Sequence, residues 1–430
     1  MRELTPQICC ALAVAMGSSL AGADEAGTPD AVEPSIWSRP ALLDYPGGPK
    51  ESLRDHGINL DLSLTQFVQG PVSGDGRNTA QYGGKADIVA GFNLSQILSI
   101  WDGASLTIHQ ELEFGHDANT QGDGSGLPVN TALGFPRLGG SDEDTSIVFS
   151  QQLGDRGVLS LGKFNMLDAA ARRPLEGGGG IDTFQNLAFA APASGITPPY
   201  ILGTSLSLRT EPIAFSVLVY DPRNAQNLDV IRNPFEDGVT VSVTGTLPTS
   251  LFGLRGAHSI RGAYSTQEGL DLANIPQIGV PDQFQDEIEA DFATVQGYWY
   301  TSYSFYQYFD EFAGASGKGW GIFGEAAISD GNPNPLRGHW YVGLGGNSFV
   351  TGRSDDLWGV AVGQYIFSDA FKSAASTAGL NIRTESVFEI YYNAAVTPWA
   401  RLSANLQVVN PALVGTDSAT FLGVRGQLKF

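Results

Sequence analysis

Apolar and polar side chains alternate in short segments along most of this chain. The segment 419–430 at the C-terminus shows the pattern clearly: Val424 and Leu428 fall on one set of alternate positions, and Arg425 and Gln427 on the other. Successive side chains of a β-strand point to opposite faces, so this segment predicts a strand with one apolar and one polar face. The chain ends on an aromatic residue within the apolar set.

Sixteen segments predict strands in this way. Their predicted bounds are 58–69, 84–94, 104–114, 144–153, 157–165, 201–210, 212–221, 238–247, 254–266, 291–303, 318–329, 338–350, 357–368, 384–396, 400–410 and 419–430.

The connections between these segments alternate between short and long over most of the chain. The short ones include 154–156, the single residue Glu211, and 397–399; the long ones include 115–143, 166–200, 267–290 and 369–383. Short turns at one end and long loops at the other are typical of outer-membrane β-barrels. A soluble sandwich with one solvated face is the alternative, but it has no reason to keep this alternation. The pattern is least regular between Tyr303 and Leu357.

The polar faces of the predicted strands fit a water-filled lumen, which sixteen strands are enough to enclose. The clearest inward polar sets lie in the first, eighth and fifteenth strands: Asn59, Asp61, Ser63 and Thr65; Thr240, Ser242 and Thr244; and Arg401, Ser403, Asn405 and Gln407. Tryptophans lie near predicted strand ends, as an interfacial aromatic girdle requires: Trp101, Trp299, Trp320, Trp340, Trp358 and Trp399. In the tenth strand, which contains Tyr298, Tyr300 and Tyr303, the sequence does not show which alternate residues face inward.

Composition agrees with a transmembrane antiparallel β-barrel over residues 58–430. Hydrophobic residues make up 42% of the chain, yet no run is long enough for a membrane helix. The mean hydropathy of -0.05 is expected when the membrane face is hidden in alternation. A net charge of -21 argues against nucleic-acid binding and would favour cations if the charges faced a pore.

The N-terminal segment has the pattern of a signal peptide. An apolar stretch from Ile8 to Leu20 is followed by Ala21-Gly22-Ala23, an A-x-A cleavage site. We expect residues 1–23 to be removed, together with both cysteines, so that the fold needs no disulfide. Residues 24–57 are then a turn-rich lead-in on the periplasmic side, with one helical turn near 50–55.

Several motifs resemble those of the carbohydrate-selective porins of the OprB type. They are Gly47-Gly48, Leu53 and Gly57-Ile58 in the lead-in, D-D-L-W-G-V-A-V-G-Q at 355–364, E-S-V-F-E-I-Y-Y at 385–392, V-T-P-W at 396–399 and L-Q-V-V-N-P at 406–411. The chain departs from the family at Tyr45-Pro46, where a Trp commonly precedes the glycine pair. The resemblance implies a sixteen-stranded outer-membrane channel that passes sugars such as glucose by diffusion.

No catalytic or cofactor-binding motif is present, so the sequence predicts neither an enzyme nor a cofactor. His109, Glu111 and Glu113 alternate on the inward face of the third strand, where a metal site and a plain polar lumen wall are both compatible with the spacing. The plain wall is the simpler interpretation.

The loop 166–200 holds the other main candidates. It contains Asp168, Arg172, Arg173 and the glycines of 177–180, and it either folds into the pore or stays outside as a solvated loop. Arginines and carboxylates can hydrogen-bond sugar hydroxyls. Strand phase also points further charged residues inward: Arg209, Arg261, Glu325, Glu389, Arg425 and, with an uncertain register, Lys163.

We therefore predict a sugar-binding constriction that combines arginines with carboxylates. Its candidate residues are Glu111, Glu113, Asp168, Arg172, Arg173, Arg261 and Glu325. The predicted partners are a monosaccharide or other small carbohydrate and outer-membrane lipid, and no oligomeric state follows from the sequence. The alternatives are a general, cation-leaning porin, motivated by the charge of -21, and an outer-membrane hydrolase, for which no nucleophile or acidic pair stands out.

Overall fold

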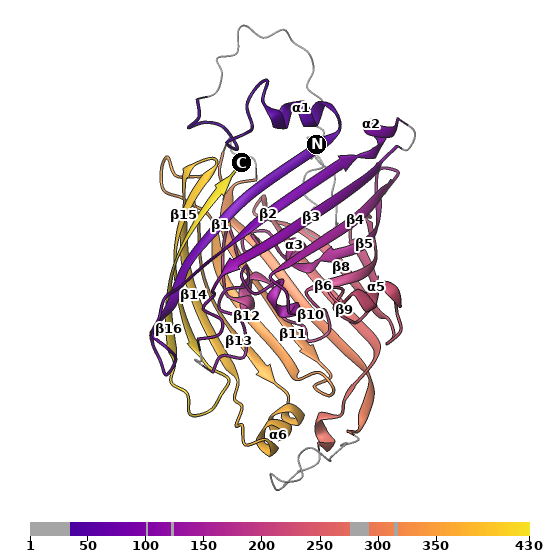
Figure 1. Cartoon of the computed structure of the whole chain (residues 1–430), viewed down its shortest axis with the longest axis vertical. Helices are drawn as coiled ribbons and strands as arrows, with labels where there is room; N and C mark the ends of the chain where they lie inside the picture. Colours follow the sequence, from indigo (N-terminus) through magenta and orange to yellow (C-terminus); the bar gives the residue numbers. More distant parts are fainter. Residues whose placement is uncertain (1–34, 100–101, 122–123, 276–291, 314–316) are drawn as a thin grey trace.

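Sixteen antiparallel strands close into a barrel in the computed structural model, which describes residues 35–99, 102–121, 124–275, 292–313 and 317–430 (Figure 1). Each strand pairs with its neighbours in sequence, and β16 pairs with β1 to close the ring. The strands are β1 Ile58–Ser73, β2 Gln81–Asn93, β3 Ala104–Gly115, β4 Glu143–Leu153, β5 Gly157–Asn165, β6 Tyr200–Leu208, β7 Ala214–Tyr220, β8 Thr240–Leu251, β9 Leu254–Leu270, β10 Thr294–Glu311, β11 Gly319–Ser329, β12 Leu336–Asn347, β13 Leu357–Phe367, β14 Glu385–Thr397, β15 Ala400–Asn410 and β16 Ala419–Lys429. The predicted barrel of about sixteen strands is confirmed.

The predicted strand limits differ most from the structure at the end of β10, and the turn before β7 is longer than predicted. β10 continues to Glu311 instead of ending at Tyr303, and its register shifts near both ends, between Gln296 and Tyr298 and again between Tyr308 and Asp310. Each irregularity interrupts the alternation of side chains, which explains why the phase of this segment was not readable. The turn between β6 and β7 spans 209–213 rather than the single predicted residue.

The connections divide between the two ends of the barrel. One end, here called the near end, holds the C-terminus and the described residues of the connections, which are 94–99, 102–103, 154–156, 209–213, 252–253, 312–313, 317–318, 348–356 and 398–399. The other, the far end, holds the described residues of 74–80, 116–121, 124–142, 166–199, 221–239, 271–275, 292–293, 330–335, 368–384 and 411–418. Most far-end loops are longer than most near-end turns, as predicted. The exceptions are the short far-end connections 74–80, 330–335 and 411–418 and the longer near-end connections 94–103 and 348–356.

The helices in the described residues are short, and all lie outside the strands. They are α1 Pro49–Asp55, α2 Leu94–Leu98, α3 Met166–Ala170, α4 Leu187–Ala190, α5 Leu228–Arg232 and α6 Asp369–Thr377, with 3-10 turns η1 Arg137–Gly139 and η2 Leu272–Asn274. None of the helices in the described part of the chain has the length and apolar character needed to cross a membrane. In Figure 1, α1 and α6 mark opposite ends of the barrel, and α3 lies at mid-height.

The alternating faces of the strands point as the sequence predicts. On β8, Thr240 and Ser242 are buried inside the barrel, while Val241 and Val243 are exposed on its outer surface. β16 follows the same rule, with Arg425 buried and Val424 exposed. The polar set of each strand therefore lines the interior, and the apolar set covers the outside.

The described part of the lead-in packs across the near end of the barrel. The Leu42 amide donates to the Lys429 carbonyl at 3.0 Å, and the Lys50 ammonium reaches both the Asp61 carboxylate, at 3.0 Å, and the Phe430 carbonyl, at 3.2 Å. The hydrogen bond from Arg54 holds the pKa of Asp44 below its usual value. These contacts tie the helix α1, which begins at a proline after Gly48, to the seam between β1 and β16.

Two sequence predictions fall outside the described residues: the signal peptide 1–23 and the position of Trp101. Three aromatic residues cluster on the outer surface at the near end, where Trp358 lies 6.0 Å from Trp320 and 5.7 Å from Phe349 between ring centroids. This cluster has the position expected for one side of an aromatic girdle.

Deleting Phe430 is expected to reduce assembly of the barrel without changing the pore. Its backbone amide donates to the Leu62 carbonyl at 2.9 Å, which is the last hydrogen bond of the seam. The measurement is the amount of heat-modifiable barrel in outer-membrane extracts. Phe430→Trp, which keeps an aromatic residue at the end of the chain, serves as the control and should assemble. Normal amounts of barrel after the deletion would contradict the expectation.

Candidate functional site

The loop 166–199 folds back into the barrel and crosses its interior. Asn165 ends β5 and accepts a hydrogen bond from the Leu167 amide at 2.9 Å, which starts α3 inside the ring of strands. The loop then contacts the inner faces of β11 to β16 before it returns to β6. Of the two positions considered for this loop, the structure has the inward one.

Aromatic packing holds the middle of the loop against the wall. The ring centroid of Phe184 lies 4.8 Å from that of Tyr391 and 5.7 Å from that of Phe323, and both loop phenylalanines, Phe184 and Phe189, are fully buried. The inner face of β13 leaves room for them because it carries Gly359, where an added Cβ would lie 2.7 Å from the Phe184 ring. A hydrophobic core thus forms inside the barrel, between loop and wall.

Two buried charges clamp the backbone of the same loop. The Arg425 guanidinium on β16 donates to the carbonyls of Gly180, at 2.8 Å, and Thr183, at 3.0 Å. The Glu389 carboxylate on β14 accepts from the amides of Gln185, at 2.7 Å, and Asn186, at 2.9 Å. Both side chains point inward as predicted, and each satisfies main-chain groups that would otherwise be buried without partners.

A second loop, 116–142, also enters the interior and packs on the first. The Thr131 amide donates to the Gln185 carbonyl at 2.7 Å, and the Val129 carbonyl accepts from Gln407 on β15 at 2.8 Å. Glu385 on β14 accepts from the Gly126 amide at 2.6 Å. The two loops together fill the side of the barrel formed by β11 to β16 and leave space along the opposite wall.

That space is a cavity of about 310 Å³, here called the main cavity, between the loop 166–199 and the wall from β4 to β11. Its wall is rich in hydroxyl groups: Ser146, Ser205, Ser216, Ser242, Thr244, Ser259, Ser302 and Ser304. Its charged residues are Asp168, Arg172, Arg173, Glu176, Arg261 and Glu325. Five of the seven residues predicted for the constriction are therefore found at this cavity.

Arg173 joins the loop to the wall through a buried polar cluster. Its guanidinium lies 2.8 Å from the Glu325 carboxylate on β11, and it donates to the Tyr341 hydroxyl on β12 at 2.7 Å. Glu176, from the same loop, lies 3.4 Å from the guanidinium; burial raises its pKa to about 7, although Arg173 opposes the rise. Tyr300 donates to Glu325 at 2.9 Å, so this carboxylate is held from two strands and the loop.

Arg172 and Arg261 differ from Arg173 because neither is engaged by a carboxylate. Arg172 is exposed and lines the main cavity, and its guanidinium has no hydrogen-bonding or ion-pair partner among the described residues. Arg261 donates to the hydroxyls of Ser242, at 2.9 Å, and Thr197, at 3.2 Å. Each carboxylate at the cavity has a basic neighbour: Asp168 lies beside His109, and Glu176 and Glu325 lie beside Arg173.

Glu111 and Glu113 lie away from the main cavity. Glu111 is 1% exposed and is bound by Lys85, Asn165 and the Tyr200 hydroxyl. Glu113 is paired with Arg137 of the loop 116–142 at 3.1 Å. Both point inward, as the alternation of β3 predicts, but strand residues bind Glu111 and Arg137 of the loop binds Glu113, so we assign them a supporting position behind the pore surface.

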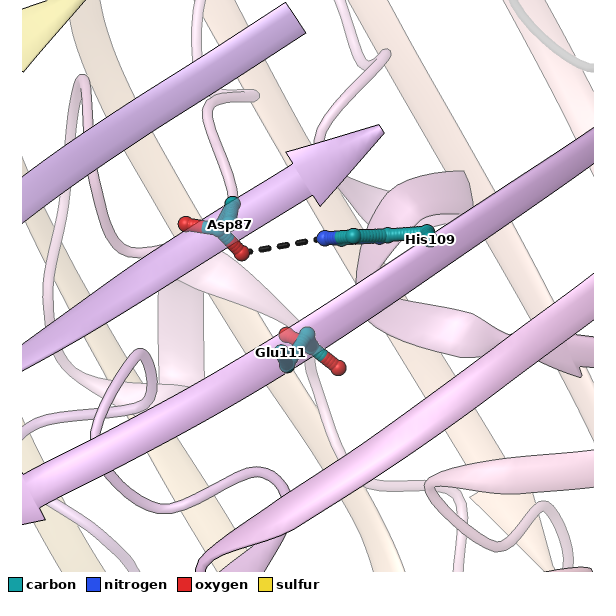
Figure 2. Close-up of side chains that lie close together, drawn as sticks. All are labelled: Asp87, His109 and Glu111. Atoms are coloured by element: carbon teal, nitrogen blue, oxygen red, sulfur yellow. Dashed lines mark hydrogen bonds and ion pairs between the residues drawn. The ribbon is translucent and has the colours of Figure 1, made fainter. Parts of the chain in front are cut away.

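His109 connects the wall to α3 through two carboxylates. Figure 2 shows its ring beside Asp87, with Nε2 3.0 Å from that carboxylate, and its Nδ1 lies 3.0 Å from the Asp168 carboxylate. Asp87, His109 and Glu111 have the donor atoms of a metal site. The Lys85 ammonium, however, contacts both carboxylates of this trio. The Lys85 ammonium thus occupies the place of a metal cation in this cluster, which favours a polar lumen wall over a metal site.

Two further charged residues were predicted to point inward, Lys163 and Arg209, and four other charged residues near the site were not predicted. Lys163 is paired with Asp144, and Arg209 lies beyond the end of β6, exposed in a turn. Sequence reasoning missed Lys85 and Asp87, although their alternation on β2 was a usable signal. It also missed Glu176 and Arg137, whose contacts with Tyr341 and Glu113 join segments distant in the sequence.

One protein family matches most of the chain. The model of the carbohydrate-selective porin family OprB matches residues 77–430. That match covers the C-terminal motifs and begins after the lead-in. No curated protein sequence gives a significant match.

Solved structures share the fold. The high-pH structure of Pseudomonas putida OprB is 20% identical, with a TM-score of 0.76 over 92% of this chain and 100% of that chain. The low-pH structure of the same protein is 16% identical, with a TM-score of 0.53 over 91% and 99%. The outer-membrane channel DcaP of Acinetobacter baumannii is 9% identical, with a TM-score of 0.50 over 87% and 97%.

Proposed function

Because this chain belongs to the carbohydrate-selective porin family OprB, we propose that its main cavity is the zone that recognises monosaccharides such as glucose. The protein is an outer-membrane channel through which sugars diffuse passively, and it is not an enzyme. Short turns mark the periplasmic side of outer-membrane barrels, so the near end is periplasmic and the far end external. The apolar outer faces of the strands contact lipid in this proposal.

Recognition would rest on the exchange of water for sugar hydroxyls at the cavity wall. A hydroxyl group both donates and accepts, and the serine and threonine hydroxyls of the wall do the same. Arg172 and Arg261 add fixed donors that no carboxylate occupies. The many weak contacts are individually easy to break, as conduction requires.

The single observation that carries this proposal is the exposed Arg172 guanidinium, which faces a wall of hydroxyls across the main cavity. The same observation disfavours a cation-leaning porin. The net charge of -21 belongs to the whole chain, whereas the charged residues of this cavity are balanced, with three arginines and three carboxylates.

Replacing Arg172 with glutamine is expected to weaken glucose block of the ion current in planar bilayers. A hydrogen bond to a charged group contributes about 1.5 kcal/mol, so the concentration for half block should rise about tenfold. Conductance without sugar should change little, because Arg172 holds no other residue in place.

Arg232→Gln is the matched control. Arg232 belongs to α5 in an external loop, its side chain is 71% exposed, and the substitution removes the same charge far from the cavity. A wild-type channel whose current is indifferent to glucose would contradict the proposed function. Equal block in Arg172→Gln and Arg232→Gln would contradict the role of Arg172.

A further inference from the structure

The main cavity has two kinds of surface. Most of its hydroxyl groups come from strands between β4 and β10, whereas the residues that the two inward loops contribute are mostly apolar. Four of these loop residues are prolines, which have no N–H donor: Pro174, Pro192, Pro198 and Pro199. The hydroxyl wall accounts for the recognition of a sugar, but it leaves the apolar surface without a partner.

Part of this apolar surface gathers at the stem of the loop 166–199. Met166, Pro199 and Leu218, here called the apolar patch, line the main cavity and are only half-buried. The Met166 amide donates to the Pro199 carbonyl at 2.9 Å, which holds the two ends of the loop together. Met166 and, on β7, Leu218 rest on a buried apolar cluster of the wall. The helix α3, which begins at Met166, lies at mid-height in Figure 1, so the patch belongs to the middle of the pore.

Polar groups adjoin the apolar patch directly. Leu218 is the cross-strand partner of Ser242 on β8, so their side chains point inward next to each other. The Ser242 hydroxyl accepts from Arg261 at 2.9 Å, and the same guanidinium donates to Thr197, at 3.2 Å, two residues before Pro199. Apolar surface and hydrogen-bonding groups therefore meet within the width of two neighbouring strands.

This arrangement restricts the kind of ligand that fits best. A glucose molecule turned toward the hydroxyl wall leaves the apolar patch in contact with water, and covering apolar surface is favourable. The cavity volume of about 310 Å³ is within the range of sites for drug-sized ligands, which are larger than a monosaccharide. A molecule that joins a sugar to a small apolar group matches both surfaces at once.

We propose that the main cavity takes glycosides with a small apolar aglycone, such as a phenyl glucoside, and binds them more tightly than glucose. The sugar exchanges hydrogen bonds with Ser242, Thr197 and Arg261, and the aglycone lies on the apolar patch. The inference rests on the proposed sugar-channel function and names a substrate class within it. The glycoside passes unchanged, with its glycosidic bond intact.

The test compares three blockers of the ion current in planar bilayers: glucose, methyl β-D-glucopyranoside and phenyl β-D-glucopyranoside. The two glycosides share the sugar and the linkage, so their difference isolates the phenyl ring. Half block by the phenyl glycoside is expected at a concentration about tenfold lower than by the methyl glycoside, because the patch covers about half of the ring. Such binding remains weak enough for exit.

Met166→Gln tests the position of the ring. Glutamine has a similar length and helix propensity but a polar end, so the ratio between the two glycosides should fall to about threefold or less. Leu228→Gln is the matched control, because it removes an apolar side chain that is 62% exposed at the start of α5, in an external loop. This variant should keep the ratio of the wild type.

The outcomes separate the aglycone site from the function on which it rests. If glucose blocks the current and the two glycosides block at equal concentrations, the aglycone site does not exist and the sugar-channel function stands. If none of the three compounds blocks, both proposals fail. A tenfold ratio that persists in Met166→Gln would overturn the assignment of the ring to the apolar patch. Should Met166→Gln not assemble, Leu218→Asn takes its place, and the comparison of the two glycosides on the wild type still decides.

Discussion

Replacing Arg173 with alanine is expected to release the loop 166–199 from the wall, raise the single-channel conductance and abolish glucose block. The side chain of Glu325 is 4% exposed and loses its guanidinium partner, and Tyr341 loses a donor. Removing one member of a buried ion pair costs about 3 kcal/mol. The loop relieves that cost by moving, so that water reaches the carboxylate. Single-channel recording with and without glucose measures both effects.

Arg173 and Arg172 are adjacent in the chain, which makes Arg172→Ala an informative comparison. Arg172 holds no part of the wall, so its loss should weaken block with little change in conductance, whereas the loss of Arg173 changes both. Arg173→Lys keeps the charge but not the two-sided contact with Glu325 and Tyr341, and should fall between the wild type and Arg173→Ala. Wild-type conductance in Arg173→Ala would mean that the aromatic packing of Phe184 and Phe189 alone fixes the loop.

Replacing Arg425 with methionine is expected to lower the heat stability of the barrel and make its current noisy. The guanidinium is 1% exposed and donates to Gly180, Thr183 and the Ser403 hydroxyl, at 3.0 Å for the last. Methionine fills the space but leaves two carbonyls buried without donors, at a cost of about 3 kcal/mol. The readouts are the temperature at which the folded band is lost in gel-shift assays and the open-channel noise.

Arg401→Met is the matched control, because Arg401 also points inward, on the neighbouring strand β15. Its contact is with the Asp355 carbonyl at 3.2 Å, in a near-end turn and not in the loop. Arg425→Lys should restore part of the stability by reaching one of the two carbonyls. If Arg401→Met and Arg425→Met lose the same stability, the clamp on the loop is not what stabilises the barrel.

The fold could be predicted because alternation is a local property of each strand. On β8, polar and apolar residues alternate between the faces, and the same alternation holds on β1, β15 and β16 except where Phe67, Val409 and Phe421 point inward. On β10, aromatic residues occupy both faces: Tyr300 is buried inside and Tyr303 exposed outside. An aromatic ring suits the lumen, the interface and the outer surface alike, so its presence does not identify a face.

The candidate site was predictable only in part, because its geometry depends on contacts between distant segments. The charge and position of Arg172 and Arg173 marked the loop, but the partners of Arg173 are Glu325 and Tyr341, more than a hundred residues further along the chain. For Glu111, alternation gave the inward direction, while its burial comes from Tyr200 and Lys85. The phase of a strand predicts which way a side chain points, but it does not predict whether residues from other segments cover that side chain.

The position of Arg425 on the last strand joins parts of the chain that are far apart in the sequence. Its acceptors, Gly180 and Thr183, precede it by 245 and 242 residues. With the loop 166–199 inside, Arg425 on the closing strand gains two main-chain acceptors besides the Ser403 hydroxyl on β15. One buried side chain therefore links the strand that seals the ring to the loop that fills it.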